Sequence, residues 1–282
     1  MMLIGYSSKA TVSVTPALGP FASSTEDGLI DGFPTRVARL FWFIFETDIT
    51  QSMTIQLSFS FPVPNRIAVV RGITLPVGTL LRVALRNAAD VVIATVDQRV
   101  VQFTDGSRGA WFVFPEGTAN SKYADLLIFD DVNGSTSGLS SGEVFDIGEF
   151  AVMPCVVVAN SADWSDEFVD PTEATLSRDS QPATVVRTGY RKIEASVSAS
   201  SYEQCYGGGL EGGMDLVQLR EAFAGDRRAI AIPRWHPGTG ILSQALVNAT
   251  AIYCTVRMGR VQHLGGDYYS VPITFTEVPT QE

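Results

Sequence analysis

Residues 53–60 read Met-Thr-Ile-Gln-Leu-Ser-Phe-Ser, and this stretch decides the fold class. Its apolar side chains, Met53, Ile55, Leu57 and Phe59, alternate with polar ones. Successive side chains of a strand point to opposite faces of a sheet, so the alternation predicts a strand with one buried and one solvent-facing side.

Short β-favouring runs of this kind recur from Thr11 to Val158, separated by Gly, Pro, Asn and Asp residues. None of them shows the 3.6-residue apolar spacing of a capped helix. Many short strands between turn residues are typical of two packed antiparallel sheets. Residues 1–158 are therefore predicted to form an antiparallel β-sandwich of the jelly-roll type.

Residues 159–187 differ in composition, because acidic side chains stand here among Ser, Thr and Pro. The acids are Asp163, Asp166, Glu167, Asp170, Glu173 and Asp179. Such a stretch buries little apolar surface. It predicts an acidic polar linker or an extended arm.

Residues 188–282 return to an ordered pattern. Ile193, Ala195 and Val197 alternate with polar residues and predict a strand. A helix is expected next, with Asp215 as its N-cap, Gln218 completing a capping box and Gly225 ending it.

Three further strands are expected after that helix, at residues 229–232, 252–258 and 268–276. One helix on a mostly antiparallel sheet is an α+β sandwich, so the whole chain is predicted to be mainly β.

The pattern of residues 188–282 resembles the tail-tube-like domain of tube and distal tail proteins of long-tailed bacteriophages. The resemblance covers about a third of the chain and lies in Arg191–Ser200, Met214–Ala224, Arg227–Pro233, Ile252–Arg260 and Tyr268–Glu277. It implies a ring around a tail axis, and no catalytic residue.

The first half resembles, more loosely, a discoidin-like jelly roll of tail-tip proteins. This likeness lies in residues 29–35, Leu-Ile-Asp-Gly-Phe-Pro-Thr, and in Gly148-Glu149-Phe150. It implies an outward decoration that touches neighbouring proteins or host glycans.

Composition limits the partners. The formal net charge is −10 and the pI is about 4.7. The negative potential around such a protein repels phosphate groups, which disfavours binding to nucleic acids and to anionic membranes. No apolar stretch is long enough to span a bilayer, and the N-terminus lacks a secretory pattern.

Cys155, Cys205 and Cys254 are widely spaced and odd in number, which indicates reduced, buried thiols and synthesis in a cytoplasm.

Residues 207–212 read Gly-Gly-Gly-Leu-Glu-Gly and formally match the GxGxxG dinucleotide motif. The preceding strand alternates, and Glu211 and Asp215 would face the pyrophosphate, so we favour a flexible loop before a capped helix. His236 and His263 lack the spacing of a metal site, and no nucleophile elbow is present. We expect neither an enzyme nor a cofactor.

Two clusters of oxygen ligands have ordinary alternatives. The acids of residues 163–170 could serve a glycosidase, but exposed acids among Ser and Pro are usually a solvated linker. Asp130, Asp131 and Asn133 could bind Ca²⁺, and turn formation explains them equally well.

Exposed aromatic side chains are the candidate contact residues. Trp42 lies in an apolar run and is expected in the core, whereas Trp164 and Trp235, with its neighbour His236, occupy polar segments. Trp164, Trp235 and His236 are therefore candidate contacts to a partner protein or a glycan.

The main hypothesis from the sequence is a structural subunit of a phage tail tip or baseplate. It would form a three- or six-fold ring around the tail axis and join the tube to tip proteins in the virion. The alternative hypothesis is a carbohydrate-binding protein that recognises host surface glycans.

Overall fold

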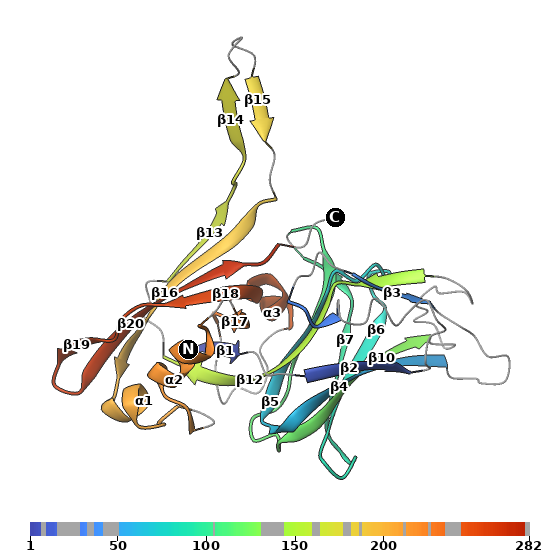
Figure 1. Cartoon of the computed structure of the whole chain (residues 1–282), viewed down its shortest axis with the longest axis horizontal. Helices are drawn as coiled ribbons and strands as arrows, with labels where there is room; N and C mark the ends of the chain where they lie inside the picture. The colour runs from blue at the N-terminus through green and yellow to red at the C-terminus, as the bar shows by residue number, and fades with distance from the viewer. Residues whose placement is uncertain are drawn as a thin grey trace.

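The computed structural model describes most of the chain (Figure 1). The described residues are 1–6, 10–15, 29–32, 37–41, 51–103, 105–130, 144–159, 164–176, 182–185, 188–210, 213–224, 227–234 and 244–279.

The first half contains a five-stranded antiparallel sheet. Its order is β2 (Ala10–Thr15), β4 (Gln51–Val63), β10 (Ser121–Asp130), β6 (Leu80–Arg86) and β7 (Val92–Arg99). The alternating stretch lies in β4, where Met53, Ile55, Leu57 and Phe59 are all buried. The prediction from that stretch is confirmed.

An eleven-stranded antiparallel sheet runs through both halves of the chain. Its order is β13 (Ser165–Val169), β16 (Tyr190–Ser200), β20 (Tyr268–Glu277), β18 (Ile252–Met258), β17 (Arg228–Ile232), β1 (Met2–Tyr6), β12 (Glu149–Val158), β5 (Asn65–Arg71), β9 (Arg108–Val113) and β8 (Val101–Gln102), with β19 (Gln262–Gly265) paired to β20. The N-terminal strand β1 pairs with β12 on one side and β17 on the other, so it joins the two halves.

Two small two-stranded sheets complete the β structure. The strands β3 (Ala38–Phe41) and β11 (Val144–Ile147) form one, and β14 (Glu173–Leu176) and β15 (Pro182–Val185) form the other. The predicted fold class is confirmed: the protein is mainly β, with an antiparallel sandwich in the first half.

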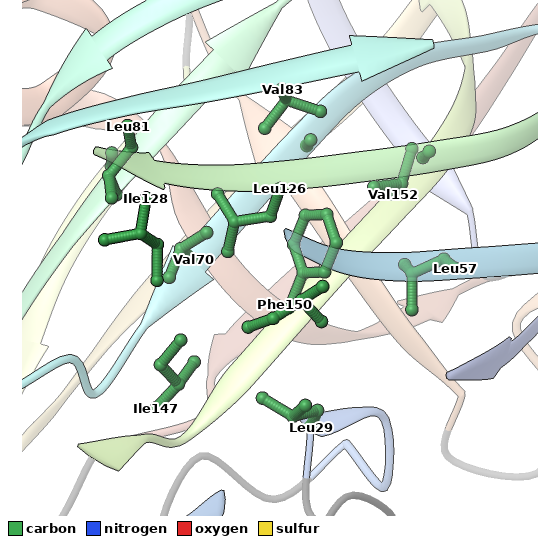
Figure 2. Packing of buried hydrophobic residues seen from close by; sticks show 14 of the residues in the cluster. Leu29, Leu57, Val70, Leu81, Val83, Leu126, Ile128, Ile147, Phe150 and Val152 are labelled. Carbon is green, nitrogen blue, oxygen red and sulfur yellow. The ribbon is translucent and has the colours of Figure 1, made fainter. Parts of the chain in front are cut away.

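Three hydrophobic clusters hold these layers together. The first fills the sandwich, where Leu57 and Leu126 of the five-stranded sheet face Val70 and Phe150 of the long sheet (Figure 2). The second and third clusters lie on opposite faces of the long sheet. Met2 and Ile4 belong to the second cluster, and Leu3, between them in β1, belongs to the third.

The described residues of the second half form three short helices, α1 (Tyr202–Tyr206), α2 (Leu216–Ala222) and α3 (Gln244–Thr250). The predicted helix is α2, and its capping box between Asp215 and Gln218 is confirmed; Gly225, expected to end it, lies outside the described residues. The expectation of a single helix was wrong, because α1 and α3 each have one buried residue, Cys205 and Val247, and so show no apolar stripe.

Candidate functional site

An arm projects from the body of the protein. Its base is β13 paired with the first residues of β16, from Ser165 opposite Glu194 to Val169 opposite Tyr190. Beyond the base, β14 and β15 pair only with each other among the described strands. Figure 1 shows this hairpin standing away from all other elements. The arm is defined here as residues 164–192.

Phe168 is the exposed apolar residue at the base of the arm, with 66% of its surface accessible. The tip of its ring lies against Gly189 on the neighbouring segment, where an added Cβ would clash with Cζ of the ring. Gly189 therefore leaves room for the ring, most of which is accessible to solvent.

Arg191 fastens the base of the arm to the body. Its guanidinium bonds Asp166 on β13, with Nη2 2.5 Å from Oδ2, and donates from Nη1 to the carbonyl of Ala249 in the last turn of α3 at 3.2 Å. Its backbone amide donates to Oε2 of Glu277 at 3.0 Å. One residue thus ties the arm to α3 and to β20.

Glu277 continues the connection into the first half of the chain. Its Oε1 lies 3.5 Å from Nη1 of Arg71, and Arg71 also pairs with Asp105. Arg71 is 1% exposed, and burial raises the pKa of Glu277 while the charge of Arg71 opposes that shift. A chain of polar contacts, Asp105–Arg71–Glu277–Arg191–Asp166, therefore runs from the sandwich to the arm. Its first three side chains are buried, and the pair of Arg191 and Asp166 at the base of the arm is partly exposed.

The candidate contact residues predicted from sequence fall near this base or outside the described residues. Trp164 begins the arm, half-buried against the second hydrophobic cluster, with the guanidinium of Arg234 5.4 Å from the centre of its ring. Trp235, His236 and the core candidate Trp42 lie outside the described residues. The contact role of these tryptophans stays a prediction.

The glycine-rich segment serves to turn the chain. Gly207 caps α1, and Gly208 has a φ of +72°. A Cβ on Gly209 would lie 2.9 Å from the backbone of Glu203. These glycines make a tight turn directly after α1; Glu211 and Gly212 lie outside the described residues, and the flexibility expected of this loop stays a prediction.

A second buried carboxyl group lies where the two halves meet. Glu149 is 2% exposed and accepts a bond from the amide of Gly32 at 3.0 Å, while Nε of Arg228 donates to the carbonyl of Gly32 at 2.6 Å. Burial raises the pKa of Glu149 to about 8, against the effects of the nearby Tyr253 hydroxyl and the hydrogen bond from Gly32, and the charge of Asp31 raises it further. The two stretches that resemble discoidin-like proteins, around residues 29–32 and 148–150, meet at this point.

No metal centre or membrane helix is found in the part of the chain that the structure describes. No three His, Cys, Asp or Glu side chains there come together as a cation site, and no helix there is long and apolar enough to span a bilayer. The candidate Ca²⁺ loop, including Asp131 and Asn133, lies outside the described residues. Cys155, Cys205 and Cys254 are free and buried, as predicted.

No protein-family model and no curated protein matches the chain. Fourteen chains of solved structures match it, and the three described here resemble about half of it. CpGH89CBM32-5 from Clostridium perfringens, in complex with GalNAc-β-1,3-galactose, is 13% identical, with 51% of this chain and 95% of that chain covered and a TM-score of 0.31. CpGH89CBM32-6 from the same organism is 12% identical, with 51% and 91% covered and a TM-score of 0.29.

The third is an arabinose-bound α-L-arabinofuranosidase, MgGH51, at 12% identity. Here 54% of this chain and 23% of that chain are covered, with a TM-score of 0.30. None of the three is a phage tail protein, so the tail resemblance still stands on sequence alone. At TM-scores of this size nothing about a ligand follows for this chain.

Sequence reasoning missed Phe168 and Phe61, whose exposures of 66% and 70% are the largest among the exposed large hydrophobic residues of the described part. Phe61 ends the alternating stretch Phe59-Ser60-Phe61 of β4, where alternation predicts a buried side chain. Phe168 stands among acids, four residues after Trp164, in a segment expected to be solvated. A second aromatic residue in this polar stretch is the signal that could have identified it.

Proposed function

We propose that the protein is a non-catalytic assembly subunit that docks on its neighbours through the arm. The observation that carries this proposal is the distal hairpin of β14 and β15, which packs on no other element in the described part of the molecule. An isolated two-stranded hairpin is only marginally stable in water. An arm that is fastened at its base by the contacts of Arg191 but leaves its far end unsupported is suited to a partner outside the chain.

The setting we propose is a phage tail tip, where the subunits form a closed ring and join the tube to tip proteins. The support for this setting is the sequence resemblance of residues 188–282. A ring repeats one heterologous contact by rotation, for which a projecting arm is well shaped. The net charge of −10 suits a ring through which DNA passes without adhering.

Shortening the arm tests the proposal. Deletion of residues 171–188 joins Asp170 to Gly189 between the paired residues Val169 and Tyr190. Asp-Gly is a favoured two-residue hairpin turn, so β13 and β16 should stay paired. We expect the shortened chain to sediment as a monomer at concentrations where the full chain forms oligomers.

The control is the thermal unfolding midpoint, which should change by less than about 3 °C because the deleted strands β14 and β15 pair with no other described strand. A shortened chain that sediments like the full-length oligomer would refute docking through the arm.

Carbohydrate binding by the sandwich is the second candidate, favoured by Phe61. Its ring is 70% exposed at the end of β4. Glu116 and Asn120 are exposed in the loop that leads to Ser121, the residue that pairs with Val63. An exposed ring beside polar side chains can stack on a sugar while its hydroxyl groups are hydrogen-bonded.

A glycan array tests this second candidate. If the sandwich binds a glycan, Phe61→Ala should weaken binding at least tenfold, because aromatic anchors contribute most of such contacts. Phe168→Ala is the matched control, since it removes an equally exposed ring from the other half and should leave glycan binding unchanged. Equal binding by Phe61→Ala and the unaltered chain would exclude Phe61 as the anchor.

A further inference from the structure

The turn at Asp31 and Gly32 is held from both halves of the chain at once. The amide of the buried Gly32 donates to Oε2 of Glu149, the first residue of β12, at 3.0 Å. The carbonyl of the same glycine accepts a bond of 2.6 Å from Nε of Arg228, the first residue of β17. Both backbone polar groups of one residue are thus bound, one by each half.

The turn fits closely at its end and is anchored at its start. Gly32 has a φ of +78°, and a Cβ added to it would lie 2.9 Å from Cγ of Arg228. Leu29 is fully buried in the first hydrophobic cluster, and Ile30 packs against that cluster. Loss of the bonds to Gly32 can therefore free the turn while Leu29 stays in the core.

The charged and titratable groups around Glu149 come from four elements. They are Asp31 on the turn, Arg228 on β17, Tyr253 on β18 and Arg71, which lies opposite Glu149 on β5. The charge of Arg228 and the amide of Gly32 favour an ionised Glu149, whereas the charge of Asp31 opposes it. The guanidinium of Arg71 pairs with Asp105 and Glu277.

The closed turn keeps water from the carboxyl group of Glu149. This side chain is 2% exposed, and a buried carboxylate is strongly disfavoured unless its partners compensate for the lost water. Burial outweighs the amide of Gly32 and the charge of Arg228, so the pKa of Glu149 is raised to about 8. Because Gly32 lies directly on the carboxyl group, lifting the turn admits water and favours the ionised form.

We propose that the turn at Asp31 and Gly32 is a proton-controlled latch between the two halves of the chain. It stays closed while Glu149 carries a proton and opens when that proton is lost, with Leu29 as its fixed end. Strand β1 joins the halves whatever the pH. The latch therefore regulates a local contact, and its opening is separate from unfolding and from assembly through the arm.

Hydrogen exchange of the Gly32 amide tests the latch, because this amide is protected while the turn is closed. The protection factor compares its exchange rate with that of an unstructured peptide at the same pH. In the unaltered full-length chain we expect this factor to fall at least tenfold from pH 6 to pH 9. At pH 9 it should also lie at least tenfold below the factors of residues 54–58, which pair with β2 and β10 on either side.

Two full-length variants assign the effect to Glu149. Glu149→Gln has no proton to lose at this position, so the protection factor of the Gly32 amide should stay constant from pH 6 to pH 9. Asp97→Asn makes the matching change in the exposed ion pair with Arg82 and should respond to pH like the unaltered chain. A Glu149→Gln chain whose protection falls as in the unaltered chain would refute control by Glu149.

Two further results would overturn the latch, and both come from the unaltered chain, so neither depends on the folding of a variant. One is a protection factor of the Gly32 amide that stays constant from pH 6 to pH 9. The other is a Gly32 amide protected as strongly as residues 54–58 at every pH, because the turn would then open only when the whole chain unfolds.

Discussion

Replacement of Arg71 by methionine is expected to lower the free energy of unfolding by about 3–5 kcal/mol. Arg71 is 1% exposed, and it pairs with Asp105 and Glu277, which are themselves buried. Removal of the guanidinium leaves two carboxylates without their counter-charge inside the protein. The loss comes from that uncompensated charge, since methionine preserves most of the side-chain volume.

Chemical denaturation measures this change, and Arg82→Met is its matched control. Arg82 also pairs with an aspartate, Asp97, with Nε 2.6 Å from Oδ1, but both side chains are about 40% exposed. An exposed ion pair contributes about 1 kcal/mol or less. Equal losses in the free energy of unfolding for the two variants would contradict the stabilising role assigned to the buried ion pairs of Arg71 with Asp105 and Glu277.

Replacement of Glu149 by glutamine is expected to remove a pH dependence of stability. The pKa of Glu149 is about 8 in the folded chain and 4.5 ordinarily, so unfolding releases a proton between these two values. Below pH 4.5 the carboxyl group is protonated in both the folded and the unfolded chain, so its burial carries no ionisation penalty. As the pH rises towards 8, the unfolded chain gives up the proton more readily than the folded chain, and the free energy of unfolding falls. The unaltered chain should lose about 3 kcal/mol relative to Glu149→Gln between pH 5 and pH 8.

Denaturant titrations at pH 5, 6, 7 and 8 measure this difference. Glutamine keeps an oxygen that can accept the bond from the amide of Gly32, so the variant should fold. Asp97→Asn is the control: the bond from Arg82 lowers the pKa of Asp97, and its contribution changes only at more acidic pH. Parallel pH profiles for the unaltered chain and Glu149→Gln would show that Glu149 is already ionised when folded.

Strands buried on one face could be predicted from the sequence. Alternation predicts which side chains face the core, both at residues 53–60 and at Ile193, Ala195 and Val197. All of these apolar residues are buried. The helix α2 carries its own start signal in Asp215 and Gln218. Each of these signals is complete within a few residues.

Elements whose pattern depends on the rest of the chain could not be predicted. Met2, Leu3 and Ile4 of β1 are buried on both faces of the long sheet, so they show no alternation. The helix α1 has a capping box from Ser201 to Gln204, but its five residues contain one buried side chain and no apolar stripe.

The candidate site was predictable only as a change of composition. Acids among Ser and Pro indicated an arm or a linker, but the fastening of that arm depends on contacts between distant residues. Arg191 meets Glu277 across 86 positions of sequence, and the further link from Glu277 to Arg71 joins the two halves of the chain. No local pattern predicts such pairs, because each partner alone looks like an ordinary surface charge.

The central claim is that copies of this protein assemble through the arm. Its most direct test is the mass of the full-length chain in solution by sedimentation velocity over a hundredfold range of concentration. We expect oligomers larger than a dimer that dissociate on dilution, as a head-to-tail contact requires. A mass that stays at the 30.4 kDa of a single chain at every concentration would contradict the claim.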